Sequence, residues 1–403
     1  MLTVTVERLG LAGDGLAGDL RVPFALPGEV ARGPVAGRIL APVEILAASP
    51  DRAAPPCRHF GACGGCALQH ASDGFVAGWK REAVVRALAA RGLAAEVGPT
   101  RTSPPGARRR AVFAARRTKK GVLVGFHGRR SDEIVETPGC LLVRPELLAA
   151  RPALAALAAR GGSRSGVLRM TATLSEGGLD VEVAGGKPLD ADLRRGLVEA
   201  AQAADLARLA WEGEPLAVLR PPAQRMGRAL VAPPPGAFLQ ATAEGAAALV
   251  AAVGAATAGA GRVVDLFAGC GTFSLPLAER AEVHALEAEP AMLAALAAGW
   301  RGAPGLRRVT TEARDLFRRP LGPAELARFD AAVIDPPRAG AEAQAAALAA
   351  SGLGVVAMVS CNPVTFARDA ALLVGGGFRL EAVEVVDQFR WSGHVEVVAR
   401  FSR

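Results

Sequence analysis

The sequence predicts a multidomain α/β protein in which a small β-barrel, a central α+β region and a doubly wound C-terminal domain follow one another. Three observations predict this fold class. Residues 1–52 contain short apolar segments separated by turn glycines, residues 53–235 mix strand and helix patterns, and residues 236–403 alternate apolar strands with helices. Such alternation is typical of a mostly parallel sheet with helices on both faces. We therefore expect three domains with these boundaries.

The first two regions are assembled from short elements. The segment GDGLAGDLRVPFALPGEVARGPVAG has the apolar alternation and turn glycines of a small barrel. In the central region, residues 75–92 have a helical period, and GVLVGF, VLRMTATL and GLDVEVAG are typical of strands. The stretch ADLRRGLVEAAQAADLARLA, residues 191–210, predicts a single helix. The proline-rich residues 221–235 mark the boundary to the C-terminal domain.

The composition favours a polyanionic partner. The chain has 47 Lys and Arg against 39 Asp and Glu, a net charge of +8. Its start has no basic segment followed by an apolar core, so we expect no signal peptide. The apolar residues 246–261 are rich in Ala and Gly, which indicates a helix of a soluble protein rather than a membrane span. We expect a cytoplasmic monomer without a membrane partner.

A glycine-rich loop follows the first strand of the C-terminal domain. The strand Val263–Phe267 leads into AGCGTFSLPLAE, in which Gly269 and Gly271 let the backbone approach a ligand at a helix N-terminus. The next strand ends in Glu287, where an acid can accept hydrogen bonds from ribose hydroxyls. The G-x-G-x-x-G pattern of dinucleotide folds is not met because residue 274 is Ser274, which favours S-adenosylmethionine over a nicotinamide cofactor.

Two neighbouring strand ends of the same domain carry reactive side chains. FDAAVIDPPRAG places Asp335 and Arg338 after the fourth strand, and VVAMVSCNP places Cys361 after the fifth. Open parallel sheets bind ligands at these ends. GHVE adds Glu396, with His394 two residues earlier on the same face. A cysteine and a carboxylate in one crevice suit nucleophilic catalysis assisted by a general base, and Arg338 is a candidate source of positive charge for a thiolate.

The remaining cysteines predict a metal site. Cys57, Cys63 and Cys66 follow a C-x5-C-x2-C spacing, and Cys140 is a fourth candidate far downstream. In a cytosolic chain of this size such cysteines are more often ligands or nucleophiles than disulfides. Four thiolates suit a [4Fe–4S] cluster or a structural zinc, and the spacing does not distinguish them. Cys270, in the glycine-rich loop, is expected only to pack.

A basic stretch over residues 108–130 lies between the proposed metal ligands Cys66 and Cys140. Clustered cations can neutralise phosphates, and aromatic rings can stack on bases. We therefore interpret this stretch as an RNA surface. Its members are Arg108, Arg109, Arg110, Arg116, Arg117, Lys119, Lys120, Arg129 and Arg130, interleaved with Phe113, Phe126 and His127.

Together these motifs resemble the RNA uracil-5-methyltransferase family, in particular its iron–sulfur-containing 23S ribosomal RNA branch. GDGLAGDL and VPFALPGE look like the N-terminal RNA-binding domain of that family, an OB-like barrel known as TRAM. CRHFGACGGCALQH looks like its cluster motif, and GAFLQAT like the segment that opens its catalytic domain. DLFAGCGTFSLPLA, LEAEPAM, DPPRAG, SCNP and GHVE match its remaining motifs in order. The resemblance covers nearly the whole chain and implies a Rossmann-like class I methyltransferase domain.

The resemblance implies roles for individual residues. Cys361 would add to carbon 6 of a uracil ring, which makes carbon 5 nucleophilic towards a methyl sulfonium, and Glu396 would remove the carbon 5 proton. The segment near residues 70–100 can pack on the catalytic domain in this family. The resemblance favours a [4Fe–4S] cluster over zinc. The implied cluster ligands are Cys57, Cys63, Cys66 and Cys140, and the implied cofactor contacts are Gln240, Phe267, Thr272, Glu287 and Asp335.

Other functions stay open on the sequence alone. The transfer RNA branch of the family generally lacks the cysteine motif, which favours ribosomal RNA, but a transfer RNA uracil-5-methyltransferase is an alternative. A non-catalytic RNA-binding or assembly factor with a vestigial methyltransferase domain is another, as is an iron–sulfur oxidoreductase. An amino-group methyltransferase fits less well, because such enzymes carry (N/D)PP(Y/F) and Arg338 stands in the aromatic position.

Overall fold

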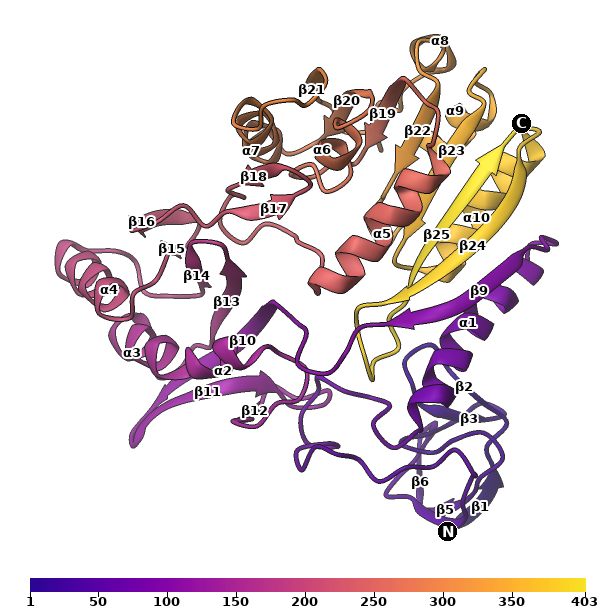
Figure 1. Ribbon diagram of the computed structural model, residues 1–403. Helices are drawn as coiled ribbons and strands as arrows, with labels where there is room; N and C mark the ends of the chain where they lie inside the picture. The colour runs from indigo at the N-terminus through magenta and orange to yellow at the C-terminus, as the bar shows by residue number, and fades with distance from the viewer.

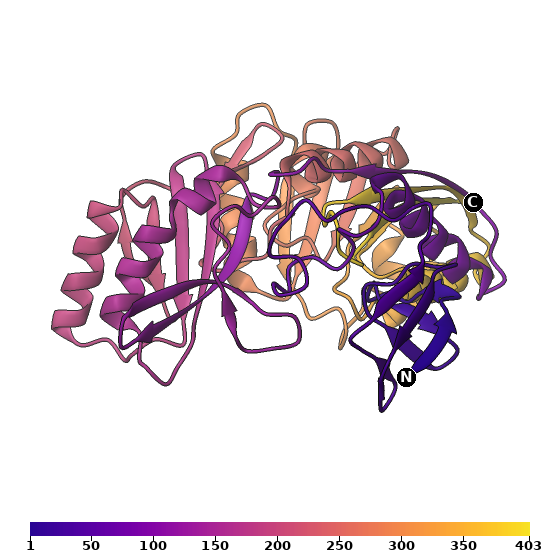
Figure 2. The same cartoon turned by 90° about the horizontal axis from the view of Figure 1, so that it is seen from below.

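The computed structural model describes residues 1–403 and arranges them in three regions (Figure 1). The N-terminal region, in indigo, lies beneath the C-terminal sheet, and the central region, in purple and magenta, extends away to the other side. The view from below shows the same arrangement (Figure 2). None of the helices is both long and apolar enough to cross a membrane.

The N-terminal region consists of eight short strands in two small sheets. Glycines and tight turns end each strand after two to four residues, as the sequence predicts. Val22, Ala31 and Leu40 are fully buried between the two sheets. Closure into a single barrel stays a prediction, because the sheets are separate. One sheet has the order β1 (Leu2–Thr5), β5 (Val30–Gly33), β8 (Glu44–Ala47); the other has β2 (Arg8–Leu9), β3 (Gly15–Ala17), β4 (Leu20–Val22), β7 (Ile39–Leu40), β6 (Val35–Ala36).

The central region is a seven-stranded sheet that packs on helices. Phe113, Leu154 and Trp211 are buried in the core between the sheet and helices α3 and α4. The order is β12 (Ile134–Val135), β11 (Gly121–His127), β10 (Arg110–Thr118), β13 (Leu168–Ser175), β14 (Gly178–Ala184), β15 (Arg208–Trp211), β16 (Glu214–Val218). The helices are α2 (Pro145–Ala149), α3 (Arg151–Gly161) and α4 (Ala191–Ala203).

The prediction of one helix over residues 191–210 is wrong. Helix α4 ends at Ala203, and the chain turns at Asp205, whose φ of 50° is incompatible with a continued right-handed helix. Residues 208–211 then form the strand β15, parallel to β14. Arg208 explains the change of direction, because its buried guanidinium donates two hydrogen bonds, of 2.8 and 2.7 Å, to Asp180 on β14. Tertiary pairing outweighs the local helical preference here.

The C-terminal region contains an eight-stranded sheet, called the C-terminal sheet below. Its order reverses between β19 and β22, which leaves a crevice at the carboxyl ends of these strands. The predicted doubly wound, mostly parallel sheet and the antiparallel pairing of its last two strands are confirmed. The order is β21 (Val309–Ala313), β20 (Glu282–Glu287), β19 (Arg262–Leu266), β22 (Ala331–Ile334), β23 (Val355–Ser360), β25 (Glu396–Ser402), β24 (Arg379–Asp387), β9 (Glu96–Thr102).

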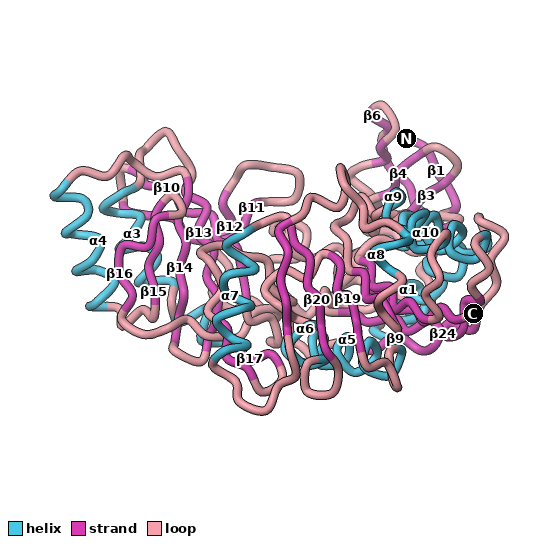
Figure 3. The backbone as a smooth tube through the Cα atoms, turned by 90° about the horizontal axis from the view of Figure 1, so that it is seen from above, coloured by secondary structure: helices cyan, strands magenta, loops and turns pink.

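Helices cover both faces of the C-terminal sheet (Figure 3). A hairpin of β17 (Gln224–Met226) and β18 (Ala229–Val231) packs on α7 and joins the central region to this sheet. One face buries apolar side chains against α1 (Asp73–Ala89), α8 (Pro323–Leu326), α9 (Glu342–Ala349) and α10 (Pro363–Gly375). The other packs on α5 (Ala243–Ala256), α6 (Ser274–Leu277) and α7 (Pro290–Arg301).

Helix α1 and strand β9 lie with the C-terminal sheet, although they precede the central region in the sequence. Strand β9 runs parallel to β24 and forms the outer edge of the sheet. Val84 and Leu88 of α1 are buried in the same core as Phe366 of α10. The chain leaves this sheet after residue 102 and returns to it at residue 262, so the central region is connected to the C-terminal sheet at both of its ends.

Candidate active site and cysteine cavity

The glycine-rich loop after β19 has the geometry of a ligand cradle. Gly269 and Gly271 adopt φ angles of 55° and 96°. A Cβ on Gly271 would lie 2.9 Å from the side chain of Leu296, so only glycine fits there. A Cβ on Gly269 would meet no atom nearer than 4.0 Å, so the loop borders open space. The turn thus leaves room for a ligand over residues 269–271.

Glu287 is held at the end of β20 beside this loop. Its Oε2 accepts a hydrogen bond of 3.0 Å from the Gly269 amide, and its Oε1 accepts bonds of 2.7 and 3.2 Å from the amides of Ala288 and Glu289. Each carboxylate oxygen can accept two hydrogen bonds, so Oε2 keeps one position free for a hydroxyl donor. This is the arrangement that recognition of a ribose requires.

The other predicted cofactor contacts lie around the same loop. Phe267 has a φ of 64°, and its ring packs against the exposed Phe317, with 5.5 Å between the ring centroids. Gln240 and Thr272 line one groove of about 880 Å³ between α5 and the central region. The side chain of Gln240 is buried, and its Oε1 accepts a hydrogen bond of 2.6 Å from Gln388. Phe317 and Gln388 were not found from the sequence.

Cys361 and Glu396 lie opposite each other at the carboxyl edge of the C-terminal sheet. Strands β23 and β25 are antiparallel, and the last paired residues are Ser360 and Val397. One further step of this register sets Cys361 against Glu396. Strand β22 lies on the other side of β23, with Ile334 opposite Met358, so Asp335 reaches the same edge. The topology therefore brings together the thiol and the two carboxyl groups.

Two hydrogen bonds tie the loops of this edge together. The Asn362 amide donates a hydrogen bond of 3.0 Å to the carbonyl of Arg338, and the Thr365 hydroxyl donates one of 3.3 Å to the same carbonyl. The DPPR and SCNP segments thus form one connected rim. Asn362 also accepts from the amide of Val364 and so caps α10.

The electrostatics of the site raise the pKa values of the Cys361 thiol and of the Glu396 carboxyl group. Burial, and then the neighbouring Glu396 and Asp335, raise the pKa of Cys361 to about 11. Burial and Asp335 raise the pKa of Glu396 to about 8. Arg338 lowers both, but by less than burial raises them. Arg338 thus acts in the expected direction, towards the thiolate, but in the free protein burial and the two carboxyl groups raise the pKa of the thiol by more than Arg338 lowers it.

His394 packs against an aromatic ring close to this site. Its ring packs on Phe389, with 5.4 Å between the centroids and an angle of 59°. Burial, followed by the cations Arg338, Arg108 and Lys80, lowers its pKa. His394 therefore favours its neutral form, and it is part of the loop between β24 and β25.

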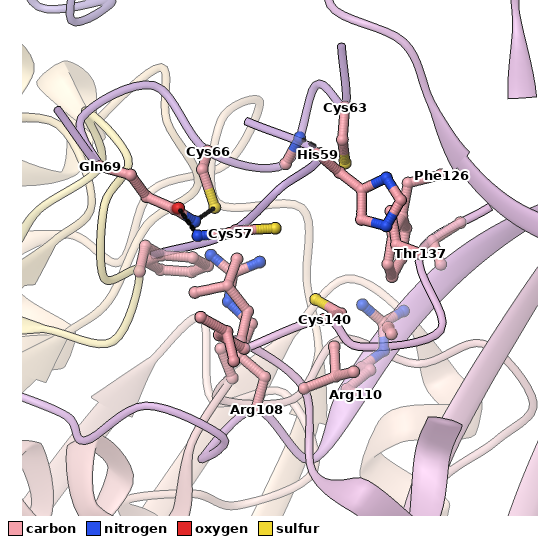
Figure 4. A pocket seen from close by; sticks show the side chains of 18 of the residues that line it. Cys57, His59, Cys63, Cys66, Gln69, Arg108, Arg110, Phe126, Thr137 and Cys140 are labelled. Atoms are coloured by element: carbon pink, nitrogen blue, oxygen red, sulfur yellow. Dashed lines mark hydrogen bonds between the residues drawn. The ribbon is translucent and has the colours of Figure 1, made fainter. Parts of the chain in front are cut away.

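Cys57, Cys63, Cys66 and Cys140 line a single cavity of about 310 Å³ (Figure 4). All four are unpaired and partly buried. The Gly65 amide donates to the sulfur of Cys63 at 3.4 Å, and the Gln69 side chain donates to that of Cys66 at 3.1 Å. As they stand, no three His, Cys, Asp or Glu side chains lie close enough together to hold a single metal ion. Cys270 lies elsewhere, buried against the sulfur of Met292.

The basic stretch is only partly an exposed surface. Arg109 and Arg110 donate to the carbonyls of Gln240 and Gly236, and Arg108 lines the cysteine cavity. Phe113 is buried and stacks on Phe126 with centroids 5.0 Å apart, so its expected availability to an RNA base is a wrong prediction.

The two arginines at the end of the stretch are also held within the protein. Arg129 and Arg130 both pair with the buried Asp14 of the N-terminal region. The exposed cations that remain are Lys119 and Lys120, at the tip of the β10–β11 hairpin.

Known proteins resemble the chain along its full length. An RNA methyltransferase of Brucella suis is 48% identical over 98% of this chain and 96% of its own length. A 23S rRNA (uracil(1939)-C(5))-methyltransferase of Chromohalobacter salexigens is 34% identical over 99% of this chain and 89% of its own. The family model of tRNA (Uracil-5-)-methyltransferase matches residues 303–402. The chain belongs to the RNA uracil-5-methyltransferase family.

Membership of this family makes the chain an S-adenosylmethionine-dependent enzyme that acts on RNA. The fold agrees: the Pyrococcus abyssi tRNA (uracil-54, C5)-methyltransferase, solved with S-adenosyl-L-homocysteine, has a TM-score of 0.76 and covers 99% of both chains at 23% identity. The predictions of the family, the enzyme class, the cofactor and an RNA substrate are thereby confirmed. The roles of single residues and the group held by the four cysteines stay predictions.

Proposed function

We propose that this enzyme methylates carbon 5 of a uridine in 23S ribosomal RNA through a covalent bond between Cys361 and carbon 6 of the uracil ring. The observation that carries the proposal is the register of β23 and β25, which sets Cys361 against Glu396. A nucleophile and a base that face each other suit a reaction in which a thiolate first adds to the ring. The base then removes a ring proton, and the thiolate is expelled.

The chemistry accounts for both residues. The thiolate of Cys361 adds to carbon 6, and the electrons of the ring double bond move to carbon 5 and the carbon 4 carbonyl. S-adenosylmethionine supplies the methyl group to carbon 5. Glu396 then takes the proton from carbon 5, the ring double bond reforms, and Cys361 leaves as a thiolate. The carboxyl group of Glu396 suits this step because its pKa of about 8 lies close to physiological pH.

The thiol of Cys361 must lose its proton when substrate binds. In the free protein burial and two carboxyl groups keep it protonated. This protects the nucleophile from oxidation and metal binding until a uracil ring and a cationic cofactor enter the site. The sulfonium charge of the cofactor would then add to that of Arg338 and favour the thiolate.

The cofactor would bind over the glycine-rich loop. Glu287 has a free lone pair for the ribose, and Phe267 with Phe317 offers an apolar wall for a planar base. Asp335, at the same strand edge as Cys361, would face the sulfonium end of the cofactor. The residues that we propose for the cofactor are Gln240, Phe267, Thr272, Glu287 and Asp335.

The four cysteines would hold a [4Fe–4S] cluster. They surround one cavity of about 310 Å³ rather than converging on a point, whereas thiolates on a zinc ion lie about 2.3 Å from it. The hydrogen bonds to the sulfurs of Cys63 and Cys66 favour thiolate ligands. Anaerobic purification followed by iron, sulfide and zinc analysis tests this. Zinc without iron or sulfide would refute the cluster.

Ribosomal RNA is the proposed substrate because the 34% identical relative acts on uracil 1939 of 23S rRNA. Transfer RNA is the second candidate, since the similar Pyrococcus abyssi enzyme acts on it, but at 23% identity that likeness concerns the fold. Residues 1–52 and the central region 53–235 would bind the RNA, and residues 236–403 would carry the chemistry. Mapping 5-methyluridine in both RNAs from cells that lack the enzyme decides between them.

The covalent step is tested with RNA that contains 5-fluorouridine. Fluorine cannot leave carbon 5 as a cation, so the enzyme and the RNA should stay linked and migrate together on a denaturing gel. Cys361→Ala should form no such band and should not methylate ordinary RNA. A Cys361→Ala variant with normal turnover would remove the residue from the proposal.

A further inference from the structure

Arg108 is a partly buried cation on the wall of the cysteine cavity. Its Nε is buried and has no hydrogen-bond partner. The carboxylate that lies near enough to act on its charge, Asp387, is already paired with Lys80 at 2.6 Å. An uncompensated cation in a buried site is costly. This wall of the cavity therefore suits an anionic occupant.

The ring of Phe389 lies between Arg108 and the active site. The guanidinium carbon of Arg108 is 5.1 Å from the centre of this ring, and the ring of His394 is 5.4 Å from it. His394 stands two residues before Glu396. Arg108 therefore contacts Phe389, and Phe389 contacts His394 in the segment that carries the proposed base. A shift of the Arg108 guanidinium would move this segment through these contacts.

The loop over residues 388–395 also contacts the cysteine segment and the proposed cofactor site. The amides of Ala67 and Leu68, directly after Cys66, donate hydrogen bonds of 2.8 and 2.9 Å to the carbonyl of Trp391. At the other end of the loop, Gln388 donates its bond of 2.6 Å to Gln240. One loop therefore touches the cysteine cavity, the cofactor side and the base.

We infer that Arg108 is a positioning residue that holds the 388–395 loop, and with it Glu396 and Gln240, in the arrangement set by an anionic group bound to the four cysteines. The inference rests on the proposed function in that the group would be the iron–sulfur cluster, which with four thiolates carries net negative charge. It gives the cysteine cavity a part in the reaction through the 388–395 loop.

Three variants of the full-length protein test the inference. Arg108→Met removes the charge, Arg108→Lys retains it, and Arg328→Met is the matched control, because Arg328 also lies 5.1 Å from a phenylalanine ring, that of Phe329. For each, iron and sulfide content, S-adenosylmethionine affinity by calorimetry and the level of the covalent adduct with ordinary RNA are measured. These readouts separate the contents of the cavity from the state of the active site.

Arg108→Met should retain iron, bind S-adenosylmethionine about tenfold more weakly, as couplings between sites usually allow, and accumulate the ordinary adduct, as is also expected when Glu396→Gln removes the proposed base. Arg108→Lys should restore most of the S-adenosylmethionine affinity and most of the adduct turnover. Arg328→Met should match the wild type. An Arg108→Met protein with wild-type affinity and no accumulated adduct would overturn the inference.

Loss of iron from Arg108→Met would leave its effect on the loop unresolved, so Phe389→Leu provides the deciding variant. It keeps the cysteines and Arg108 and removes only the packing between Arg108 and His394. Accumulated adduct in iron-replete Phe389→Leu supports the relay, and normal adduct turnover overturns it. Wild-type protein without iron or sulfide would overturn the cluster and this inference together, while normal adduct formation in that preparation would leave the methyl-transfer proposal standing.

Discussion

At the scale of single residues, the site is defined by what surrounds each reactive group. Cys361 and Cys270 are both partly or fully buried thiols with raised pKa values. They differ in their neighbours, because Cys270 meets the sulfur of Met292 whereas Cys361 faces Glu396, Asp335 and Arg338. The environment of Cys361, and not its acidity in the free protein, is what suits it to a covalent role.

The raised pKa of Glu396 predicts the pH dependence of adduct resolution. A carboxyl group with a pKa of about 8 is mostly protonated at pH 7, and only its deprotonated form can take the carbon 5 proton. The rate should therefore rise with pH, roughly tenfold per unit below the pKa, and level off above it. Cys361 does not interfere, because it is covalently bound in the adduct.

The measurement is the decay of preformed adduct after a jump to each pH between 6 and 9, quenched with acid and resolved on a gel. Glu396→Gln is the control and should decay slowly at every pH. A decay rate of the wild type that is constant over this range would exclude Glu396 as the base.

Site residues could be predicted from the sequence where the topology of the sheet determines their place. Parallel strands present their carboxyl ends at one edge, so Asp335, Cys361 and Glu287 follow from the pattern of strands alone. Arg108 and Gln388 carry no such signal. Gln388 bonds to Gln240, 148 residues away, and only the folded chain brings the two together.

At the scale of elements, the β24–β25 pair and helix α1 hold in place the carboxyl edge of the C-terminal sheet, where Cys361 and Glu396 lie. Lys80 of α1 pairs with Asp387 at the end of β24, and both side chains are only 1% exposed. Lys80 also donates to the carbonyl of Phe389 at 3.2 Å, so α1 fixes the start of the 388–395 loop. Strand β9 continues the same attachment, because it pairs with β24 directly after α1.

Lys80→Met should destabilise the protein by about 3–5 kcal/mol, because it leaves the buried Asp387 carboxylate without its cation. Denaturant unfolding measures the loss. Arg86→Met on the same helix is the matched control, since its pair with Glu82 is exposed and should contribute under about 0.5 kcal/mol. Adding Asp387→Asn should restore most of the stability; a double variant as unstable as Lys80→Met would contradict the electrostatic explanation.

Element boundaries were predictable where periodicity and tertiary pairing agree. The helix expected over residues 75–92 is α1, and the strands expected in the C-terminal region are present. The prediction failed at residues 204–211, where the Arg208–Asp180 pair draws a helix-like segment into the central sheet. The pairing of β9 with β24 leaves no local pattern either, and only the family resemblance indicated that the segment near residues 70–100 packs on the C-terminal domain.

At the scale of the whole molecule, Asp14 joins the N-terminal region to the central region. Its side chain is 2% exposed and meets Arg129, Arg130 and Arg21. Arg129 and Arg130 of the basic stretch therefore join the central region to the N-terminal region. These pairs hold the N-terminal and central regions in a fixed relation to each other.

Asp14→Asn should loosen this contact, because three arginines would then face one another around a neutral amide. A loss of about 2–5 kcal/mol in docking is expected, which should speed proteolysis between residues 48 and 56 and weaken RNA binding. S-adenosylmethionine affinity should not change, since its site lies in another region. Asp19→Asn, at an exposed position, is the control. Unchanged proteolysis in Asp14→Asn would show that other contacts suffice.

The tip of the β10–β11 hairpin offers the free positive charge that a bound RNA would meet. Lys119 and Lys120 are exposed there and are not among the cations held within the protein. Each phosphate that they neutralise should contribute about 0.7–0.9 to the slope of log K against log salt concentration. Lys119→Ala with Lys120→Ala should therefore lower that slope by about 1.5 without altering which uridine is methylated. Lys187→Ala, an exposed lysine elsewhere in the central region, should leave it unchanged. Equal slopes for the wild type and the double variant would exclude the hairpin tip as a site of phosphate contact.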